Sequence, residues 1–196
     1  MATWVTDLRH VPGEDADDVP TAARDRARFT RDVVAASTSR LVEGRWPTAV
    51  QCVARVGPKT CGGCVAVWHV GGRDEIEWVC AACGANGVIT GFTGSESDLS
   101  RYRPRGKGKL RLWGYEDEER DVLWEATRAI PELRAVIARA TPHDEYPGVF
   151  VLHATVAELD DVYTLVEELT DRTRSRRRRD LLDGLRATLC TAMDGF

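Results

Sequence analysis

The sequence lacks any apolar run that approaches the roughly 18 residues needed to span a membrane. Its first residues, MATWVTDLRHV, also lack the basic segment followed by an apolar segment that marks a secretory signal. We therefore expect a cytoplasmic protein without a membrane partner. The chain has 6 cysteines, and all except Cys190 lie at short spacings. In a reducing cytosol, such cysteines are more often metal ligands or redox groups than disulfides.

Known catalytic motifs are missing as well. Zinc deaminases need H-x-E and P-C-x-x-C, but here His69 is followed by Val70 and Cys80 is preceded by Val79. The segment RPRGKGK fails the phosphate-loop pattern, and neither H-E-x-x-H nor G-x-S-x-G occurs. The sequence thus predicts a protein that is not an enzyme and has no catalytic residues.

Lysine is scarce, since only three of the 27 basic residues are Lys, and the formal net charge is −4. The chain as a whole is therefore not attracted to polyanions. Basic residues nevertheless gather in two segments without acids, 101–111 and 172–179, which hold 12 of the 27. Candidate contacts with nucleic acid or with an acidic partner are Arg101, Arg103, Arg105, Lys107, Lys109, Arg111, Arg174, Arg176, Arg177, Arg178 and Arg179.

The cysteines form the strongest motif. Cys61, Cys64, Cys80 and Cys83 follow the pattern C-x2-C-x15-C-x2-C, which is typical of a tetrahedral Zn²⁺ site. Four thiolates leave no open position for water or substrate, so we expect structural zinc. A redox function is the alternative, but it requires a CxxC pair that enters a helix of a βαβ unit, and neither pair does so.

The segment CVARVGPKTCGGCV followed by IEWVCAACGANGVITGF resembles an uncharacterised bacterial zinc-ribbon family without an established activity. The pattern of that family is a wide first cysteine pair and then W-x-C-x-x-C-G-x-x-G-x-I. The resemblance covers about Trp46 to Phe92 and implies a zinc ribbon. It also implies Cys52 and Cys61 as the first pair, so Cys52 is an alternative fourth ligand in place of Cys64. Local loop closure favours Cys64, because its gap to Cys61 is shorter.

The fold class that we predict is α+β. CVAVWHV, EIEWVC and GVITGF predict a small three-stranded antiparallel sheet, the zinc ribbon, over 46–94. Residues 1–45 are expected to form a loose N-terminal tail and a short helix. Residues 95–196 are expected to form a basic linker and a mainly helical region with one or two strands, KLRLW and GVFVLHAT.

The last forty residues predict a long C-terminal helix. One apolar stripe ends near Leu169 and a second begins at Leu181. A helix that began at Ser175 would place four arginines against the positive end of its dipole. We therefore expect one helix to run through 170–180, or else the first helix to extend to about Arg177.

These features favour a non-enzymatic adaptor or regulatory module that binds another protein or a second copy through the C-terminal helices. The alternative is a nucleic-acid-binding accessory protein that uses the ribbon and both basic segments. Its aromatic contacts would come from Trp68, Trp78 and Phe92, although a small ribbon also needs large side chains to cover its own sheet. The acidic total charge favours the adaptor.

Overall fold

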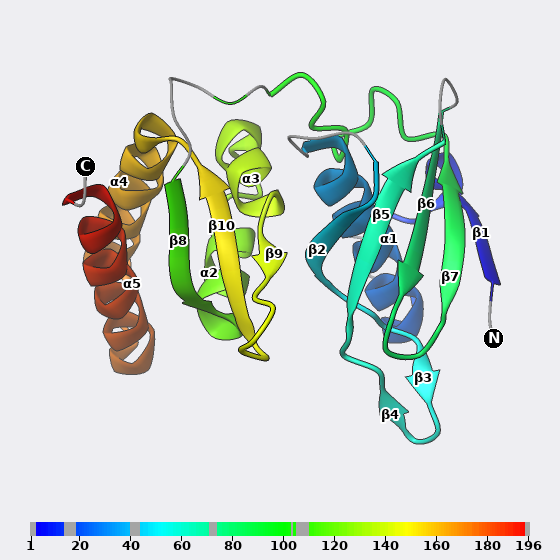
Figure 1. The fold of residues 1–196 in the computed structure, drawn as a ribbon, viewed down its shortest axis with the longest axis horizontal. Coiled ribbons are helices and arrows are strands. Elements are labelled where there is room, and N and C mark those ends of the chain that lie inside the picture. The colour runs from blue at the N-terminus through cyan, green and yellow to red at the C-terminus, as the bar shows by residue number, and fades with distance from the viewer. Residues whose placement is uncertain are drawn as a thin grey trace. The chain divides into compact units, whose positions relative to one another are not determined.

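The computed structural model describes residues 3–13, 19–39, 44–70, 74–102, 104 and 110–194, with the backbone alone for 110–115 (Figure 1). The predicted α+β class is confirmed. The chain divides into two compact units, Met1–Arg101 and Tyr102–Phe196, and each is described by itself. Within the described residues, no helix is both long enough and apolar enough to cross a bilayer.

A five-stranded mixed sheet forms the N-terminal unit, in the order β1-β7-β6-β5-β2. The predicted three-stranded antiparallel sheet is its centre, β5-β6-β7. On one side β2 joins antiparallel to β5, and on the other β1 joins parallel to β7. The bounds are Thr3–Asp7 (β1), Trp46–Gln51 (β2), Cys64–His69 (β5), Glu75–Cys80 (β6) and Asn86–Thr90 (β7).

The expectation of a loose N-terminal tail is wrong for β1. This strand is the outermost strand on one side of the sheet. The ring of Trp4 packs edge-on against the rings of Phe29 and Trp78, with distances of 5.9 and 5.4 Å between the ring centroids. Helix α1, Thr21–Ser39, covers one face of the sheet and brings Phe29 to 5.0 Å from Trp78. The structure therefore places β1 and α1 in the same unit as the strands of 46–94, rather than in a separate segment 1–45.

Alternation along the strands builds this core. Val65, Val67, Ile76, Trp78 and Ile89 are all buried, while their neighbours in sequence are half-buried or exposed. Gly87 lies under the central tryptophan, because a Cβ there would come within 2.5 Å of the Trp4 carbonyl oxygen and 2.8 Å of the Trp78 Nε1 atom. The close approach of the Trp4 backbone and the Trp78 ring thus requires glycine at this position.

The C-terminal unit contains a three-stranded sheet, β8-β10-β9, and four helices among its described residues. Both predicted strands are present, in β8 and β10. The bounds are Leu110–Glu116 (β8), Asp117–Ala126 (α2), Pro131–Ala138 (α3), Thr141–Pro142 (β9), Val149–Ala154 (β10), Val156–Arg172 (α4) and Arg176–Asp194 (α5). Local sequence sets the starts of α3 and α4, with Pro131 in the first turn of α3 and a Thr155–Glu158 capping box at α4.

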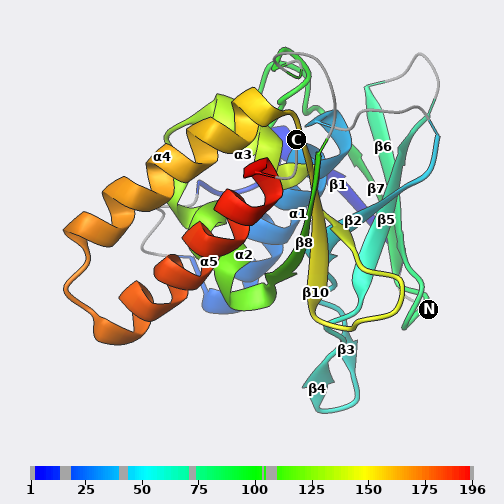
Figure 2. The ribbon, with the colours of Figure 1, turned by 60° about the vertical axis from the view of Figure 1, so that its left-hand side comes forward.

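Both predictions for this segment, one helix through 170–180 and a first helix that extends to about Arg177, are wrong. Helix α4 ends at Arg172, Thr173 is extended with ψ 132°, and α5 begins at Arg176 and returns beside α4 (Figure 2). The turn-back buries Leu182, Leu185 and Leu189 completely. Burial contributes about 1.5–3 kcal/mol per leucine, whereas each arginine at the helix start costs about 0.3–1 kcal/mol, so packing outweighs the dipole. These three leucines of α5 are therefore buried by packing within the chain.

Candidate metal centre

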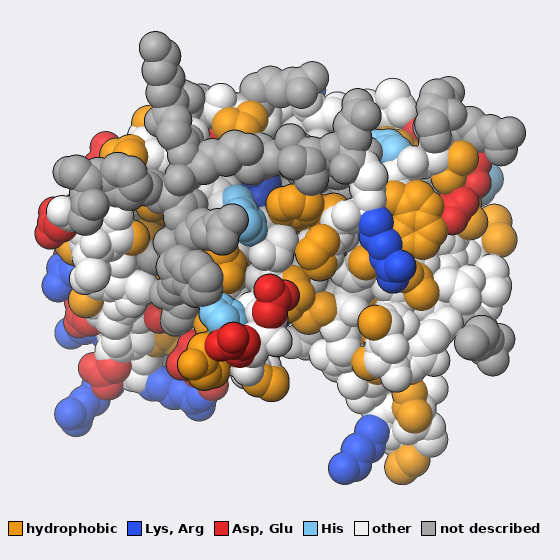
Figure 3. Space-filling model, viewed as in Figure 1, with side chains coloured by type: hydrophobic (Ala, Val, Ile, Leu, Met, Phe, Trp, Pro, Cys, Tyr) orange, Lys and Arg blue, Asp and Glu red, His pale blue; other side chains and the backbone are white. Residues whose placement is uncertain are grey.

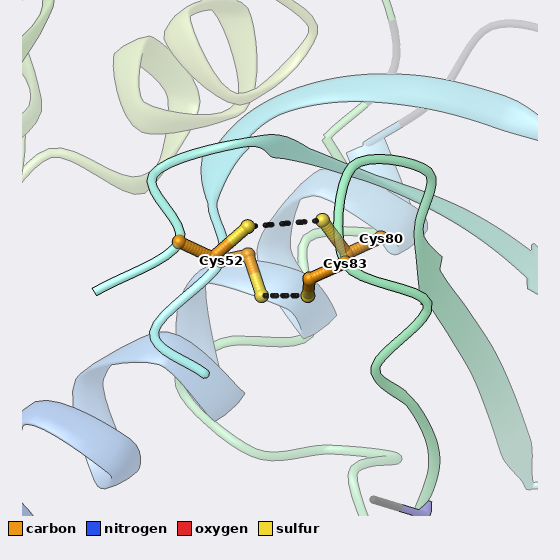
Figure 4. A group of neighbouring side chains, drawn as sticks. Cys52, Cys80 and Cys83 are labelled. Atoms are coloured by element: carbon orange, nitrogen blue, oxygen red, sulfur yellow. Dashed lines mark hydrogen bonds between the residues drawn. The ribbon is translucent and has the colours of Figure 1, made fainter. Parts of the chain in front are cut away.

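Four cysteine sulfurs converge at one end of the N-terminal sheet. The Sγ atoms of Cys52 and Cys83 lie 3.8 Å apart, and those of Cys61 and Cys80 lie 3.7 Å apart (Figure 4). All four sulfurs lie within 4.8 Å of one another. Cys52 and Cys80 are buried, while Cys61 and Cys83 are half-buried. The group thus lies at the border between the core and the surface.

One pair of ligand positions is set by a projecting hairpin. The chain leaves β2 at Cys52, folds into the two-stranded hairpin β3 (Arg55–Val56) and β4 (Lys59–Thr60), and returns at Cys61. The Cys61 N–H donates to the Ala54 carbonyl at 2.8 Å, and the Cys52 N–H donates to the Gly63 carbonyl at 2.7 Å. These bonds close the base of the hairpin and bring its two cysteines together.

The second pair lies on a tight turn after β6. The Gly84 N–H donates to the Cys80 carbonyl at 2.9 Å, and the Cys80 N–H donates to the Ala85 carbonyl at 2.8 Å. Gly84 has a φ of 72°, in the left-handed region that favours glycine. Gly63 faces this turn from the other loop, and a Cβ there would lie 2.6 Å from that of Ala82. Glycine at 63 therefore lets the two loops approach.

The sulfur geometry fits a tetrahedral metal. A zinc–sulfur bond is about 2.3 Å, which gives about 3.8 Å between two sulfurs of a regular tetrahedron. The observed 3.7 and 3.8 Å agree with that edge. A disulfide holds its sulfurs at about 2.05 Å, so neither pair is bonded. A soft set of four thiols suits Zn²⁺ and other thiophilic ions.

Electrostatics at the site also favour a cation. Burial raises the pKa of Cys52 far above the ordinary value for a thiol. The Gly63 N–H lowers the pKa of Cys61, but burial and the sulfurs of Cys83 and Cys80 outweigh it, and the net shift is upward. The backbone N–H of Ala85 lowers the pKa of Cys83. Four thiolates cannot share this space without a positive ion, so metal binding would displace protons.

Among the described residues, Cys64 is not part of the group, and the geometry favours the ligand set with Cys52. Val65 and Val67 face the core, so alternation along β5 turns Cys64 to the opposite face. Closure of the longer loop costs little because Arg55–Val56 pairs with Lys59–Thr60 inside it, as β3 and β4. Cys61, Cys80 and Cys83 belong to both predicted sets, and the wide first pair of the family pattern was the signal for Cys52.

The predicted aromatic contacts are mostly internal. Trp78 is 2% exposed and Phe92 5% exposed, so neither ring is available to stack on a base. Trp68 is half-buried on the sheet face that α1 does not cover, with the Arg45 guanidinium 5.6 Å from its ring. On that face, where hydrophobic side chains gather in Figure 3, Glu77 is paired opposite Trp68. An acidic residue beside the half-buried tryptophan disfavours a nucleic-acid surface here.

The structure describes only part of the first basic segment, 101–111, but all of the second, 172–179. Arg103, Arg105, Lys107 and Lys109 lie outside the described residues, Arg101 is exposed, and Arg111 lies in β8 with only its backbone described. The five arginines of the second segment, Arg174 and Arg176–Arg179, are all exposed around the start of α5.

Ion pairs neutralise little of this second segment. Arg177 pairs with Glu118 of α2 at 2.6 Å. Among the described residues, Arg174, Arg176 and Arg178 form no ion pair, and Arg179 donates to the Thr173 carbonyl at 2.9 Å. Most of this positive charge is therefore left uncompensated by the part of the chain that the structure describes.

Comparisons with protein-family models, with curated proteins and with solved structures found no match. The metal centre therefore rests on its own geometry.

Proposed function

We propose that the protein is a non-enzymatic interaction adaptor whose N-terminal unit is a zinc ribbon held together by one structural Zn²⁺. The observation that supports this most is the convergence of four sulfurs at the spacing of a tetrahedral zinc site. Four protein ligands saturate the metal and leave no position for a substrate. The zinc then supplies folding energy, and function lies in the surfaces that the two units present. The free thiols suit the reducing cytoplasm, where we place the protein.

The metal would stabilise the unit in two ways. It would link the base of the β3–β4 hairpin to the turn after β6 through Cys61 and Cys80. It would also neutralise sulfurs that pack in the main core, since Cys52 and Cys80 belong to the same hydrophobic cluster as Trp78. Loss of the ion would thus loosen the sheet, in addition to freeing the hairpin.

Metal analysis tests this proposal. Freshly purified wild-type protein should contain about one zinc per chain, and Cys80→Ser should contain none. Cys190→Ser is the matched control, because Cys190 lies on α5 in the other unit and should leave the zinc content unchanged. Wild-type protein without metal, or with a disulfide among these four cysteines, would refute the structural zinc. For the adaptor role, partners that co-purify with the wild type and are lost with Cys80→Ser would identify the interactions that need the ribbon.

Nucleic-acid binding is the second candidate, and one observation favours it. The exposed arginines at 174, 176 and 178 have no acidic partner among the described residues, and such charges bind phosphates well. Against it stand the buried rings of Trp78 and Phe92 and the acidic total charge. Salt-dependent binding of an oligonucleotide distinguishes the two candidates.

A further inference from the structure

A groove of about 310 Å³ opens in the C-terminal unit between α2 and the start of α5. Its lining combines charged, hydroxyl and apolar side chains from the two helices and the residue before α5. The lining residues are Glu118, Asp121, Val122, Ser175, Arg177, Arg178 and Leu181. Both Val122 and Leu181 are half-buried, so the groove has an apolar part that a single side chain can occupy.

The two walls of the groove differ in their remaining charge. On the α2 wall, Asp121 pairs with Arg120 at 2.8 Å and Glu118 pairs with Arg177 at 2.6 Å. On the α5 wall, Arg178 has no ion pair with any described residue, and neither do Arg174 and Arg176 beside it. The acids of the groove are thus neutralised within the chain, while Arg174, Arg176 and Arg178 have no acidic partner in the part of the chain that the structure describes.

These arginines cost stability where they lie. The first turn of α5 contains four arginines and no acid, so its cations face the positive end of the helix dipole. The Ser175 hydroxyl accepts from the Arg178 N–H at 3.4 Å, a long bond that compensates little. Their side chains are exposed, so core packing does not require arginine here. A local arrangement that is unfavourable and unneeded for folding is expected at a functional surface.

We propose that this groove and its arginines bind an acidic segment of a partner protein. An apolar side chain of the segment lies between Val122 and Leu181, and flanking carboxylates pair with Arg178 in the lining and with the exposed Arg174 and Arg176 beside the groove. The apolar part favours a peptide over nucleic acid, because none of the lining residues that the structure describes is an aromatic side chain on which a base could stack. This inference rests on the proposed adaptor function and names the chemistry of its partner.

Fluorescence polarisation with defined probes tests the inference on the full-length protein. The probe is a labelled peptide of about 12 residues with a central leucine flanked by glutamates, measured at about 150 mM salt. Two control peptides replace the glutamates by glutamine or the leucine by serine. We expect the acidic leucine peptide to bind about tenfold more tightly than either control, since several exposed ion pairs and one seated side chain each contribute modestly.

A matched pair of triple variants locates the site. Replacing Arg174, Arg176 and Arg178 by Gln should weaken the acidic peptide about tenfold. Replacing Arg128, Arg172 and Arg186 by Gln removes the same charge from the same unit, but these arginines already pair with Glu125, Glu168 and Asp183. This second variant should bind like the wild type. Equal losses in both variants, or equal affinity for all three peptides, would overturn the inference.

An oligonucleotide of about 20 nucleotides completes the test. Submicromolar, steeply salt-dependent binding that the first triple variant abolishes would assign the arginines to nucleic acid and overturn the peptide site. Failure of the groove can be told apart from failure of the proposed function. The peptide result depends on residues of the C-terminal unit, whereas the zinc content and Cys80→Ser report on the N-terminal unit.

Discussion

The sulfurs of Cys52 and Cys83 lie 3.8 Å apart, although 31 positions separate the residues in the chain. The two residues lie on different loops. Cys52 lies at the base of the β3–β4 hairpin, which returns the chain to Cys61, and Cys83 lies on the tight turn that follows Cys80. The site therefore depends on both loops at once. A substitution in either loop should therefore alter both the metal affinity and the stability of the sheet.

The fourth ligand can be tested with two serine variants. Cys52→Ser should weaken zinc binding by roughly a hundredfold or more, since even outer partners of a metal are worth about 10- to 100-fold. Cys64→Ser should leave the affinity close to that of the wild type, because its side chain lies on the opposite face of β5. Competition with a chromophoric chelator measures both. A large loss of affinity in Cys64→Ser and none in Cys52→Ser would instead support Cys64 as the fourth ligand.

Metal removal should loosen one unit and spare the other. After chelation, backbone amides of β5, β6 and β7 should lose protection in hydrogen exchange measured by mass spectrometry, because two of the sulfurs belong to the core cluster. The amides of α4 and α5 should exchange as before. Unchanged protection throughout the sheet would mean that the metal contributes nothing to its stability.

The buried ion pair of the C-terminal unit gives a stability prediction. Arg139 and Glu158 lie 2.8 Å apart, and their side chains are 1% and 2% exposed. Arg139→Met leaves a buried carboxylate without its cation and should lower the free energy of unfolding by about 3–5 kcal/mol. Adding Glu158→Gln removes that charge while keeping an oxygen for the Thr155 N–H, so the double variant should recover most of the loss. Urea denaturation measures both, and a double variant no more stable than Arg139→Met would contradict this account.

The edge strand β1 should respond to acid through Asp7. A hydrogen bond from the Arg9 side chain lowers the pKa of Asp7 from 3.8 to about 2. Because the folded pKa is depressed, the contribution of this carboxylate to stability is present above pH 3.8 and is lost as the pH falls through about 2. An NMR titration of Asp7 should show the low pKa, and Arg9→Gln should return it toward 3.8. A midpoint near the ordinary value in the wild type would disprove the contact.

The arginines in the first turn of α5 should lower the stability of the fold while they contribute to binding of the proposed partner. Arg176→Gln removes one cation from the first turn of the helix and should raise the free energy of unfolding by about 0.3–1 kcal/mol. The same change at Arg186, which lies further along α5 and pairs with Asp183, should not stabilise the protein. Thermal unfolding measures both. If Arg176→Gln is destabilising, the arginine serves the fold and its cost is not evidence for a partner.

Local sequence was sufficient for the elements whose pattern is local. Short runs that contain Val, Ile and Trp on either side of the turn GGRDE mark β5 and β6 as strands, and Pro131 places the start of α3. Cys61, Cys80 and Cys83 were predicted as metal ligands from the short spacing of their thiols, and the structure brings all three into the group of four sulfurs.

Three features depended on contacts between distant residues. Strand β1 exists because Thr3–Asp7 pairs with Asn86–Thr90, about eighty positions away, and no local signal distinguishes it from a tail. Cys52 enters the metal site because the chain between it and Cys61 folds on itself and Cys64 is turned away by the pleat of β5. The break between α4 and α5 arises because burial of the apolar faces of these two helices outweighs the dipole penalty of the arginines. In each case the free energy that determines the structure comes from surfaces that meet only after the chain has folded. Tertiary packing therefore determined these features, because the local preferences of the sequence were weak or favoured a different structure.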